Sequence, residues 1–251
     1  MTHHVTVHFH DEINFFLPEK HRDTPIEHPV NFRVSIKDLL ESLGPPHTEM
    51  SLIVVNGVSV DFNHIVEPGS HIDVYPDFDA IDLPHKVALR PSYTGKPTFV
   101  LDTHLGKLAN TLRLMGYDTL YRNDYPDDEL AQVSDTEGRI LLTRDIGLLK
   151  RGRVLYGYYV RATDPHQKLI EVTRRYNLLD DMRPFSRCIT CNGLLQPVEK
   201  ATIIDQLPEQ SAQAFDEFAQ CDSCSQVFWK GSHYDRMQDI IAQLRVDVTL
   251  V

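Results

Sequence analysis

The chain has 251 residues, of which 41% are hydrophobic and 24% charged, and its formal net charge is −11 at pH 7. This composition is typical of a globular protein, and the length allows two domains or more. No window holds the roughly eighteen consecutive apolar residues that a membrane span needs. The N-terminal sequence MTHHVTVHFH lacks the basic and apolar regions of a secretory signal, so we expect a cytoplasmic protein without a membrane segment.

The charge is unevenly distributed along the chain. Residues 1–90 hold 6 Lys and Arg against 14 Asp and Glu, whereas residues 139–187 hold 11 against 5. A basic stretch inside an acidic protein is compatible with a polyanionic partner. A solvated helical face is the alternative interpretation.

Residues 1–78 have the pattern of a small module of strands and one helix. VTVHF alternates as a half-buried strand does, and VSIKDLLESLG (34–44) has helical spacing with Ser35 as a candidate N-cap. Asn56-Gly57 predicts a hairpin turn, and a last strand follows VEPGS. This order is that of a β-grasp fold and resembles the ubiquitin-like sulfur carriers. Those carriers end in a free Gly-Gly, which is missing here, so we expect an accessory module that docks a protein partner.

Two further features accompany this module. His4, His8 and His10 alternate along the first strand, where they form either a polar solvated face or a metal site. Residues 79–97 lack periodicity and contain three prolines, which predicts a linker.

Residues 98–180 repeat a unit of strand, acid and helix. The strand-like runs are TFVL, DTLY, RILLT and VLYGYYV, and the acids that follow them are Asp102, then Asp127, Asp128 and Glu129, then Asp145, then Asp164. Successive units of this kind predict an α/β fold with a mostly parallel sheet covered by helices. Ligands of such sheets bind beyond the carboxyl ends of the strands, which is where these acids are expected.

Each acid has two interpretations. An Asp before a helix caps the first backbone N–H groups, which typically stabilises by about 1 kcal/mol. Several carboxylates at one sheet edge instead repel one another unless a cation lies among them, and carboxylates with open water positions favour Mg²⁺ or Mn²⁺. On this interpretation Asp102 shares a metal ion with Asp128, Asp145 and Asp164. Dinucleotide and P-loop glycine motifs are missing from the sequence.

All four cysteines lie in two C-x₂-C pairs separated by 29 residues. Cys188, Cys191, Cys221 and Cys224 match two knuckles that close one tetrahedral zinc site. Disulfides are the alternative, which the lack of a secretory signal disfavours. Four thiolates leave no open position on the metal, so the zinc is expected to be structural, with a helix or loop inserted between the knuckles.

The last stretch, VFWKGSHYDRMQDIIAQL, predicts a C-terminal helix that starts near Ser232. Phe228 and Trp229 either pack beneath the zinc site or stack on a nucleobase. His233 and Arg236 are candidates for contacts with a substrate phosphate.

Three stretches together resemble one family. They are LDTHLGKLANTLRLMGYDTLY, DDELAQ with GRILLTRD, and RPFSRCITCNG with CDSC and VFWKGSHYDRM, over about residues 98–238. They are similar to the Mut-seven C-terminal ribonuclease domain, a PIN-like nuclease fused to a zinc ribbon. The resemblance implies a three-layer PIN-like domain over residues 98–180 and a zinc ribbon with a C-terminal helix over residues 181–251.

The resemblance also implies an activity. PIN-like nucleases hold Mg²⁺ or Mn²⁺ with a cluster of acids and hydrolyse single-stranded RNA. Carried onto this chain, the first acid is Asp102 and the acid after the third strand is Asp145. The second acid is Asp127, Asp128 or Glu129, and Asp164 is the last candidate.

The sequence therefore predicts a metal-dependent ribonuclease. Asp102, Asp128 and Asp145 are expected to hold the catalytic ion, and Lys107, Arg144 and Arg151 to attract RNA phosphates. Two alternatives remain: a non-catalytic RNA-binding or adaptor protein whose acids only cap helices, and a metal-dependent phosphatase.

Overall fold

The computed structural model describes residues 3–30 and 33–249. It divides into two compact units, each with segments distant in sequence. The first unit contains the chain up to Thr94 together with Ser134–Tyr159, and the second contains Gly95–Val133 together with the chain from Val160 onward. None of the helices in the described part of the chain combines the length and the apolar character that crossing a membrane requires.

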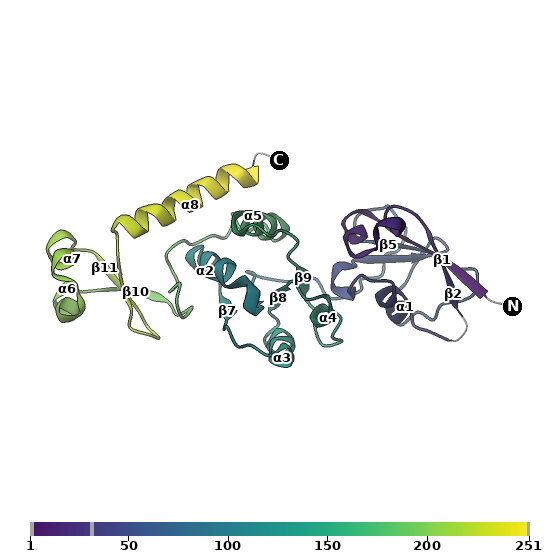
Figure 1. Cartoon of the computed structure of the whole chain (residues 1–251), viewed down its shortest axis with the longest axis horizontal. Coiled ribbons are helices and arrows are strands. Elements are labelled where there is room, and N and C mark those ends of the chain that lie inside the picture. The colour runs from purple at the N-terminus through teal and green to yellow at the C-terminus, as the bar shows by residue number, and fades with distance from the viewer. Residues whose placement is uncertain (1–2, 31–32, 250–251) are drawn as a thin grey trace. The chain divides into compact units, whose positions relative to one another are not determined.

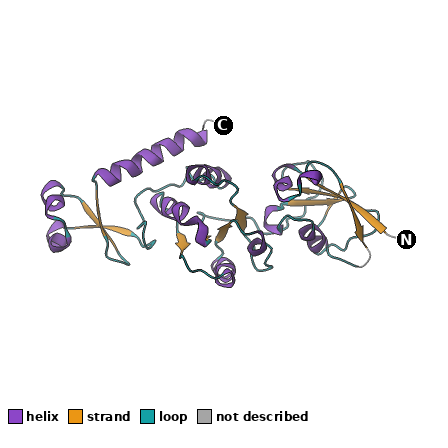
Figure 2. Ribbon diagram, viewed as in Figure 1, coloured by secondary structure: helices purple, strands orange, loops and turns teal. Residues whose placement is uncertain are grey.

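The N-terminal module is a five-stranded mixed sheet with the strand order β2-β1-β5-β3-β4 (Figures 1 and 2). β1 runs parallel to β5, whereas β1 with β2, β3 with β4 and β3 with β5 pair in antiparallel orientation. Among the described residues of the module, one α-helix and three 3-10 helices accompany the sheet, which confirms the β-grasp-like fold. The elements are β1 (His3–Phe9), η1 (Asp11–Phe16), η2 (Glu19–His21), β2 (Ile26–Val30), α1 (Ile36–Ser42), η3 (His47–Glu49), β3 (Leu52–Val55), β4 (Val58–Ser59) and β5 (His71–Tyr75).

The alternation of the sequence accounts for the core of this module. Val5, Val7 and Phe9 on β1 are each at most 1% exposed, because successive side chains of a strand point to opposite faces of the sheet. Asn56 and Gly57 both have positive φ, as the predicted tight hairpin turn between β3 and β4 requires.

The expected linker, residues 79–97, contains no helix or strand. It is nevertheless held against the N-terminal module by hydrogen bonds. The Arg90 guanidinium donates to the carbonyl oxygens of His47 and Thr48, and the Val87 N–H donates to the Ser59 hydroxyl.

The second sheet has four strands in the order β7-β6-β8-β9. β6 pairs in parallel with β7, and β8 pairs in parallel with β9, as the repeated units predicted. Helices follow the strands along the chain. The elements are β6 (Phe99–Leu101), η4 (Thr103–Leu105), α2 (Gly106–Leu114), β7 (Thr119–Tyr121), α3 (Asp127–Glu137), β8 (Ile140–Thr143), α4 (Ile146–Leu149), β9 (Gly157–Tyr159) and α5 (Pro165–Arg175).

The N-terminal module contacts β9 and α4 within the first unit. The Glu49 carboxylate is 2% exposed, and its Oε1 accepts a 2.7 Å hydrogen bond from the N–H of Tyr159. Nε2 of His47 lies 2.9 Å from the carbonyl oxygen of Val154, and Nζ of Lys150 donates to the carbonyl oxygen of Glu41. The module is therefore hydrogen-bonded to this part of the chain at several points.

The C-terminal part is a three-stranded antiparallel sheet followed by a long helix (Figure 1). Its elements are β10 (Leu195–Val198), α6 (Lys200–Ile203), η5 (Ile204–Gln206), α7 (Glu209–Ala214), β11 (Phe218–Cys221), β12 (Val227–Trp229) and α8 (Ser232–Thr249). α6, η5 and α7 form the insertion expected between the knuckles. α8 packs on α5, where Nε2 of His166 lies 2.6 Å from Oδ2 of Asp247.

Candidate functional site

Asp102 directly follows β6 and is buried, with 8% of the residue exposed. It occupies the N-cap position of η4, but its carboxylate accepts no capping hydrogen bond from that helix, whose residues are all described. Oδ1 instead accepts a 3.1 Å hydrogen bond from the Thr103 hydroxyl. Helix capping therefore does not explain this buried acid.

The loop after Asp102 is fixed by Tyr121 on β7. The Tyr121 hydroxyl donates to the carbonyl oxygen of Thr103 at 2.9 Å and lies 2.6 Å from Oδ1 of Asn123. A Cβ atom at Gly106 would come within 2.5 Å of the same hydroxyl, so a larger residue where α2 begins would displace the Tyr121 side chain. The backbone beside Asp102 is thus held in place by a side chain of the neighbouring strand.

Asp145 follows β8 after one intervening residue and is exposed. Its Oδ1 accepts a 3.1 Å hydrogen bond from the Leu148 N–H at the start of α4, and its own N–H donates to the Thr143 hydroxyl. The carboxylate therefore caps a helix, and because an exposed carboxylate has further lone pairs, capping leaves it able to bind a cation as well.

The three candidates for the second acid differ in their surroundings. Asp127 and Asp128 are exposed at the first turn of α3. Glu129 receives two hydrogen bonds from the Arg122 guanidinium, at 3.0 and 2.8 Å. This bidentate pair occupies both carboxylate oxygens of Glu129.

Asp164 is the N-cap of α5, with Pro165 as the first helical residue. Its Oδ1 accepts hydrogen bonds from the N–H groups of His166 and Gln167 at 2.9 and 3.0 Å.

A second acid of this region, Glu171, was not singled out from the sequence. Its two carboxylate oxygens accept the N–H groups of Arg161 and Ala162, each at 2.8 Å, and so fix the chain after β9.

The acids are distributed over the two compact units. Asp102, Asp128 and Asp164 belong to the second unit, and Asp145 belongs to the first. Their joint binding of one ion therefore remains a proposal.

The candidate phosphate-binding cations occupy separate elements. Lys107 is exposed on α2, one turn after Asp102. Arg144 places its guanidinium 5.9 Å from the ring centroid of Tyr159, and Arg151 follows α4. His233 and Arg236 are exposed in the first turns of α8.

The four cysteines converge as their spacing predicted. Their ligand atoms all lie within 4.8 Å of one another, and Cys188 and Cys221 are buried. The sulfur atoms of Cys188 and Cys224 are 3.8 Å apart, and those of Cys191 and Cys221 are 3.3 Å apart. A disulfide needs about 2.05 Å, whereas two sulfurs on one tetrahedral zinc ion lie about 3.8 Å apart. The cluster therefore fits a structural zinc ion.

Both cysteine knuckles fold in the same way. The N–H of Asn192 donates to the Cys188 carbonyl at 2.9 Å, and the N–H of Ser225 donates to the Cys221 carbonyl at 3.1 Å. Asn192 and Ser225 have φ values of +74° and +61°. Each knuckle thus closes on a residue in the left-handed region, four positions after its first cysteine.

The thiols differ in acidity. Burial and the neighbouring thiols raise the pKa of Cys191 to about 12, although the backbone N–H of Gly193 acts in the opposite direction. Burial also disfavours the Cys221 thiolate, but the N–H groups of Cys224 and Ser223 outweigh it and lower the pKa of Cys221 to about 7. A bound metal cation would lower the pKa of each of the four thiols, because it stabilises all four thiolates.

A buried arginine ties the first knuckle to α2. Arg113 is 3% exposed, and its guanidinium donates to the carbonyl oxygens of Thr119, Ile189 and Thr190 at 2.9, 3.1 and 2.9 Å. Asn192 adds two further bonds, since its Oδ1 accepts the N–H of Thr119 and its Nδ2 donates to Asp118. Within the second unit, the knuckle is therefore fixed to the elements around β7.

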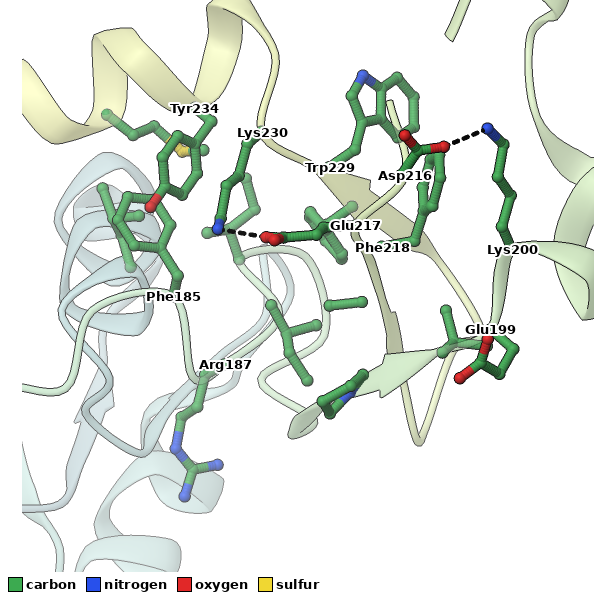
Figure 3. A pocket seen from close by; sticks show the side chains of 18 residues that line it. Phe185, Arg187, Glu199, Lys200, Asp216, Glu217, Phe218, Trp229, Lys230 and Tyr234 are labelled. Atoms are coloured by element: carbon green, nitrogen blue, oxygen red, sulfur yellow. Dashed lines mark hydrogen bonds and ion pairs between the residues drawn. The ribbon is translucent and has the colours of Figure 1, made fainter. Parts of the chain in front are cut away.

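A pocket of about 650 Å³ lies beside the zinc ribbon (Figure 3). Phe228 and Trp229 line it. Phe185 and Tyr234 also line it, and their ring centroids lie 4.3 Å apart. Its lysines are paired with acids: Lys230 with Glu217 and Lys200 with Asp216. Arg187 and Glu199 also line the pocket, so the three basic and three acidic side chains of its lining balance, and the pocket has no cationic excess.

The fold and the cysteine site define a class of protein: a β-grasp module followed by an α/β domain that carries a zinc-ribbon-like cluster. A family model described as the Mut7-C RNAse domain matches residues 97–241, and one described as Mut7-C ubiquitin matches residues 2–82. The chain belongs to the Mut7-C RNase domain family, as the resemblance of its sequence indicated, and this membership implies a ribonuclease with an RNA substrate. Searches of curated proteins and of solved structures found no match.

Proposed function

We propose that the chain is a Mg²⁺- or Mn²⁺-dependent ribonuclease whose catalytic ion is held by Asp102, Asp145 and one acid at the start of α3. The observation that carries the proposal is the position of Asp102. Its carboxylate directly follows a strand, is 8% exposed and accepts no capping hydrogen bond from its helix. Ligands of parallel sheets bind beyond the carboxyl ends of the strands, so this carboxylate lies where a catalytic ion would be held.

The donor set fits a hard cation. Carboxylate oxygens are the ligands that Mg²⁺ and Mn²⁺ prefer, and such an ion, when bound, stabilises the charge that develops on a phosphodiester during attack by water. Asp145 is suited to serve as cap and ligand together, because one of its oxygens already accepts the Leu148 N–H. Thr103 orients the Asp102 carboxylate through its hydroxyl.

The basic residues have a separate role in this proposal. Lys107, Arg144 and Arg151 attract RNA phosphates, and His233 and Arg236 extend the contact along α8. Phosphate contacts of this kind raise affinity without reading the base sequence, and salt weakens them. Substitution of Lys107 is thus expected to weaken RNA binding and its salt dependence while the cleavage step is retained.

The test compares cleavage of a labelled mixed RNA ladder by the full chain with Mn²⁺ and with EDTA. Asp145→Asn keeps the oxygen that caps α4 but removes the charge, so it should fold normally and lose cleavage. Asp102→Asn should behave in the same way. Asp135→Asn, an exposed acid on the same helix as Asp128, is the control and should cleave normally. Normal cleavage by Asp145→Asn would overturn the assignment.

The same assay separates the alternatives. Asp127→Asn and Asp128→Asn, made separately, identify the second acid by which of them loses cleavage. RNA binding that persists in EDTA without any product would favour the adaptor interpretation. Hydrolysis of a phosphomonoester in place of RNA would favour the phosphatase.

A further inference from the structure

Two groups of three or more potential metal ligands occur in the part of the chain that the structure describes. One is the four-cysteine cluster, and the other consists of His8, His10 and Asp73 in the N-terminal module. The ligand atoms of this second group also lie within 4.8 Å of one another. We propose that His8, His10 and Asp73 form a second metal site, which takes a zinc-class divalent ion.

The strand geometry brings the three side chains together. His8 on β1 and His10, the residue after its end, alternate with buried Val7 and Phe9, so both lie on the side of the chain opposite the core. β5 runs parallel to β1, in a register that places Asp73 opposite His8. Of the three histidines considered from the sequence, His4 is exposed and lies outside this group.

Both imidazoles present a nitrogen to the same carboxylate oxygen. Nε2 of His10 lies 2.9 Å from Oδ1 of Asp73, and Nδ1 of His8 lies 3.7 Å from it. Two ligand atoms bound at 2.0–2.1 Å to one tetrahedral ion are separated by about 3.3 Å. The observed distances lie on either side of this value, so small shifts of the side chains would suffice to bind an ion.

An aromatic neighbour holds one of the ligands in place. The ring of His10 stacks on Tyr75, with centroids 4.1 Å apart and planes 9° apart, and this contact fixes the plane of the imidazole.

The ligand set selects the kind of ion. Two imidazoles and one carboxylate suit Zn²⁺, Ni²⁺ or Cu²⁺, whereas Mg²⁺ prefers oxygen ligands alone. The side chains of His8, His10 and Asp73 are 34%, 24% and 39% exposed, so the site opens to solvent. Three protein ligands and access for water leave a fourth position open, unlike in the cysteine cluster.

The test uses the full chain loaded with one zinc ion per molecule at the cysteines. Calorimetric titration with Zn²⁺, together with metal analysis after dialysis, should reveal a second ion, and Mg²⁺ should not replace it. His10→Gln and Asp73→Asn should each weaken this second binding by at least about tenfold, since each removes a ligand. His28→Gln, a half-buried histidine on β2, is the matched control and should bind as the parent does.

A spectroscopic readout makes the test independent of RNA cleavage. Among the 13 histidines, Zn²⁺ should shift the ring-nitrogen resonances of His8 and His10 by far the most. The proposal is overturned if no second ion binds. Binding that is unchanged in both His10→Gln and Asp73→Asn would also overturn it. Thermal unfolding of each variant without added metal verifies that its fold is intact.

Discussion

Substitution of Arg113 by Met should loosen the first zinc knuckle. Methionine preserves the apolar stem of the side chain, so the change removes mainly the guanidinium and its hydrogen bonds to three carbonyl oxygens. Two of these carbonyls belong to Ile189 and Thr190, which lie between the ligands Cys188 and Cys191. The same substitution therefore tests both the stability of the second unit and the retention of its zinc.

The expected loss in the free energy of unfolding follows from the burial of the three hydrogen bonds. A hydrogen bond from a charged donor contributes about 1.5–3 kcal/mol, and an unsatisfied buried partner adds about 1–3 kcal/mol to the cost of losing it. Part of this is offset, because the variant no longer desolvates a guanidinium whose residue is 3% exposed. We expect a net loss of about 3–5 kcal/mol, which is a large part of the stability of an ordinary domain.

Urea unfolding with zinc present measures the stability, and transfer of zinc to a coloured chelator measures its retention. Arg113→Met should lower the urea midpoint and speed zinc release, whereas Arg153→Met, which alters an exposed arginine, should do neither. A change of stability within about 0.5 kcal/mol, the range of surface substitutions, together with unchanged zinc release would refute this account of Arg113.

Three other predictions follow from the second unit. Removal of zinc by a chelator should shift the fluorescence of Trp229, the single tryptophan and a residue of β12, and an unchanged spectrum would argue against zinc as the support of this sheet. Gly116→Ala should lower the urea midpoint far more than the control Gly138→Ala. Both glycines have positive φ, but of the two only Gly116 would bring a Cβ atom within 2.2 Å of a backbone oxygen. Burial, and then Asp181 and Asp180, raise the pKa of Tyr117 to about 12, so its contribution to stability should be complete below about pH 10 and fall between pH 10 and 12. Tyr117→Phe should abolish that fall, and an unchanged alkaline profile would contradict the assignment.

Local patterns predicted much of the fold because they have local causes. Alternation identified the buried face of β1, and Asn56-Gly57 identified the turn between β3 and β4 because few residues adopt positive φ. The cysteine spacing predicted the cluster because a knuckle forms within a few residues of chain.

The acids show where local patterns cease to be informative. Asp102 and Asp164 both stand between a strand and a helix, yet Asp164 caps its helix and Asp102 does not. Pro165 was a usable signal for the cap, since proline suits the first helical position. The sequence offered no comparable signal that Asp102 would be buried without capping.

Other residues escaped sequence reasoning because their partners are distant. Glu171 binds backbone groups ten and nine residues earlier, and Arg113 reaches carbonyls more than seventy residues later. Asp73 lies opposite His8 because of the register between β5 and β1, and the alternation of the sequence alone does not determine that register. Tertiary pairing decided each of these cases.

The hydrogen bond from Tyr159 to the Glu49 carboxylate bears on how this protein can be dissected. The donor is the backbone N–H of Tyr159 in β9, an edge strand of the four-stranded sheet. The acceptor, Glu49, belongs to the ubiquitin-like part of the chain. A fragment that begins at the family boundary near residue 97 loses that acceptor, as well as the contacts of His47 and Glu41 with Val154 and Lys150. Such a fragment would expose a bare strand edge prone to self-association, so a failure of the isolated nuclease to cleave RNA would say little about its catalytic groups.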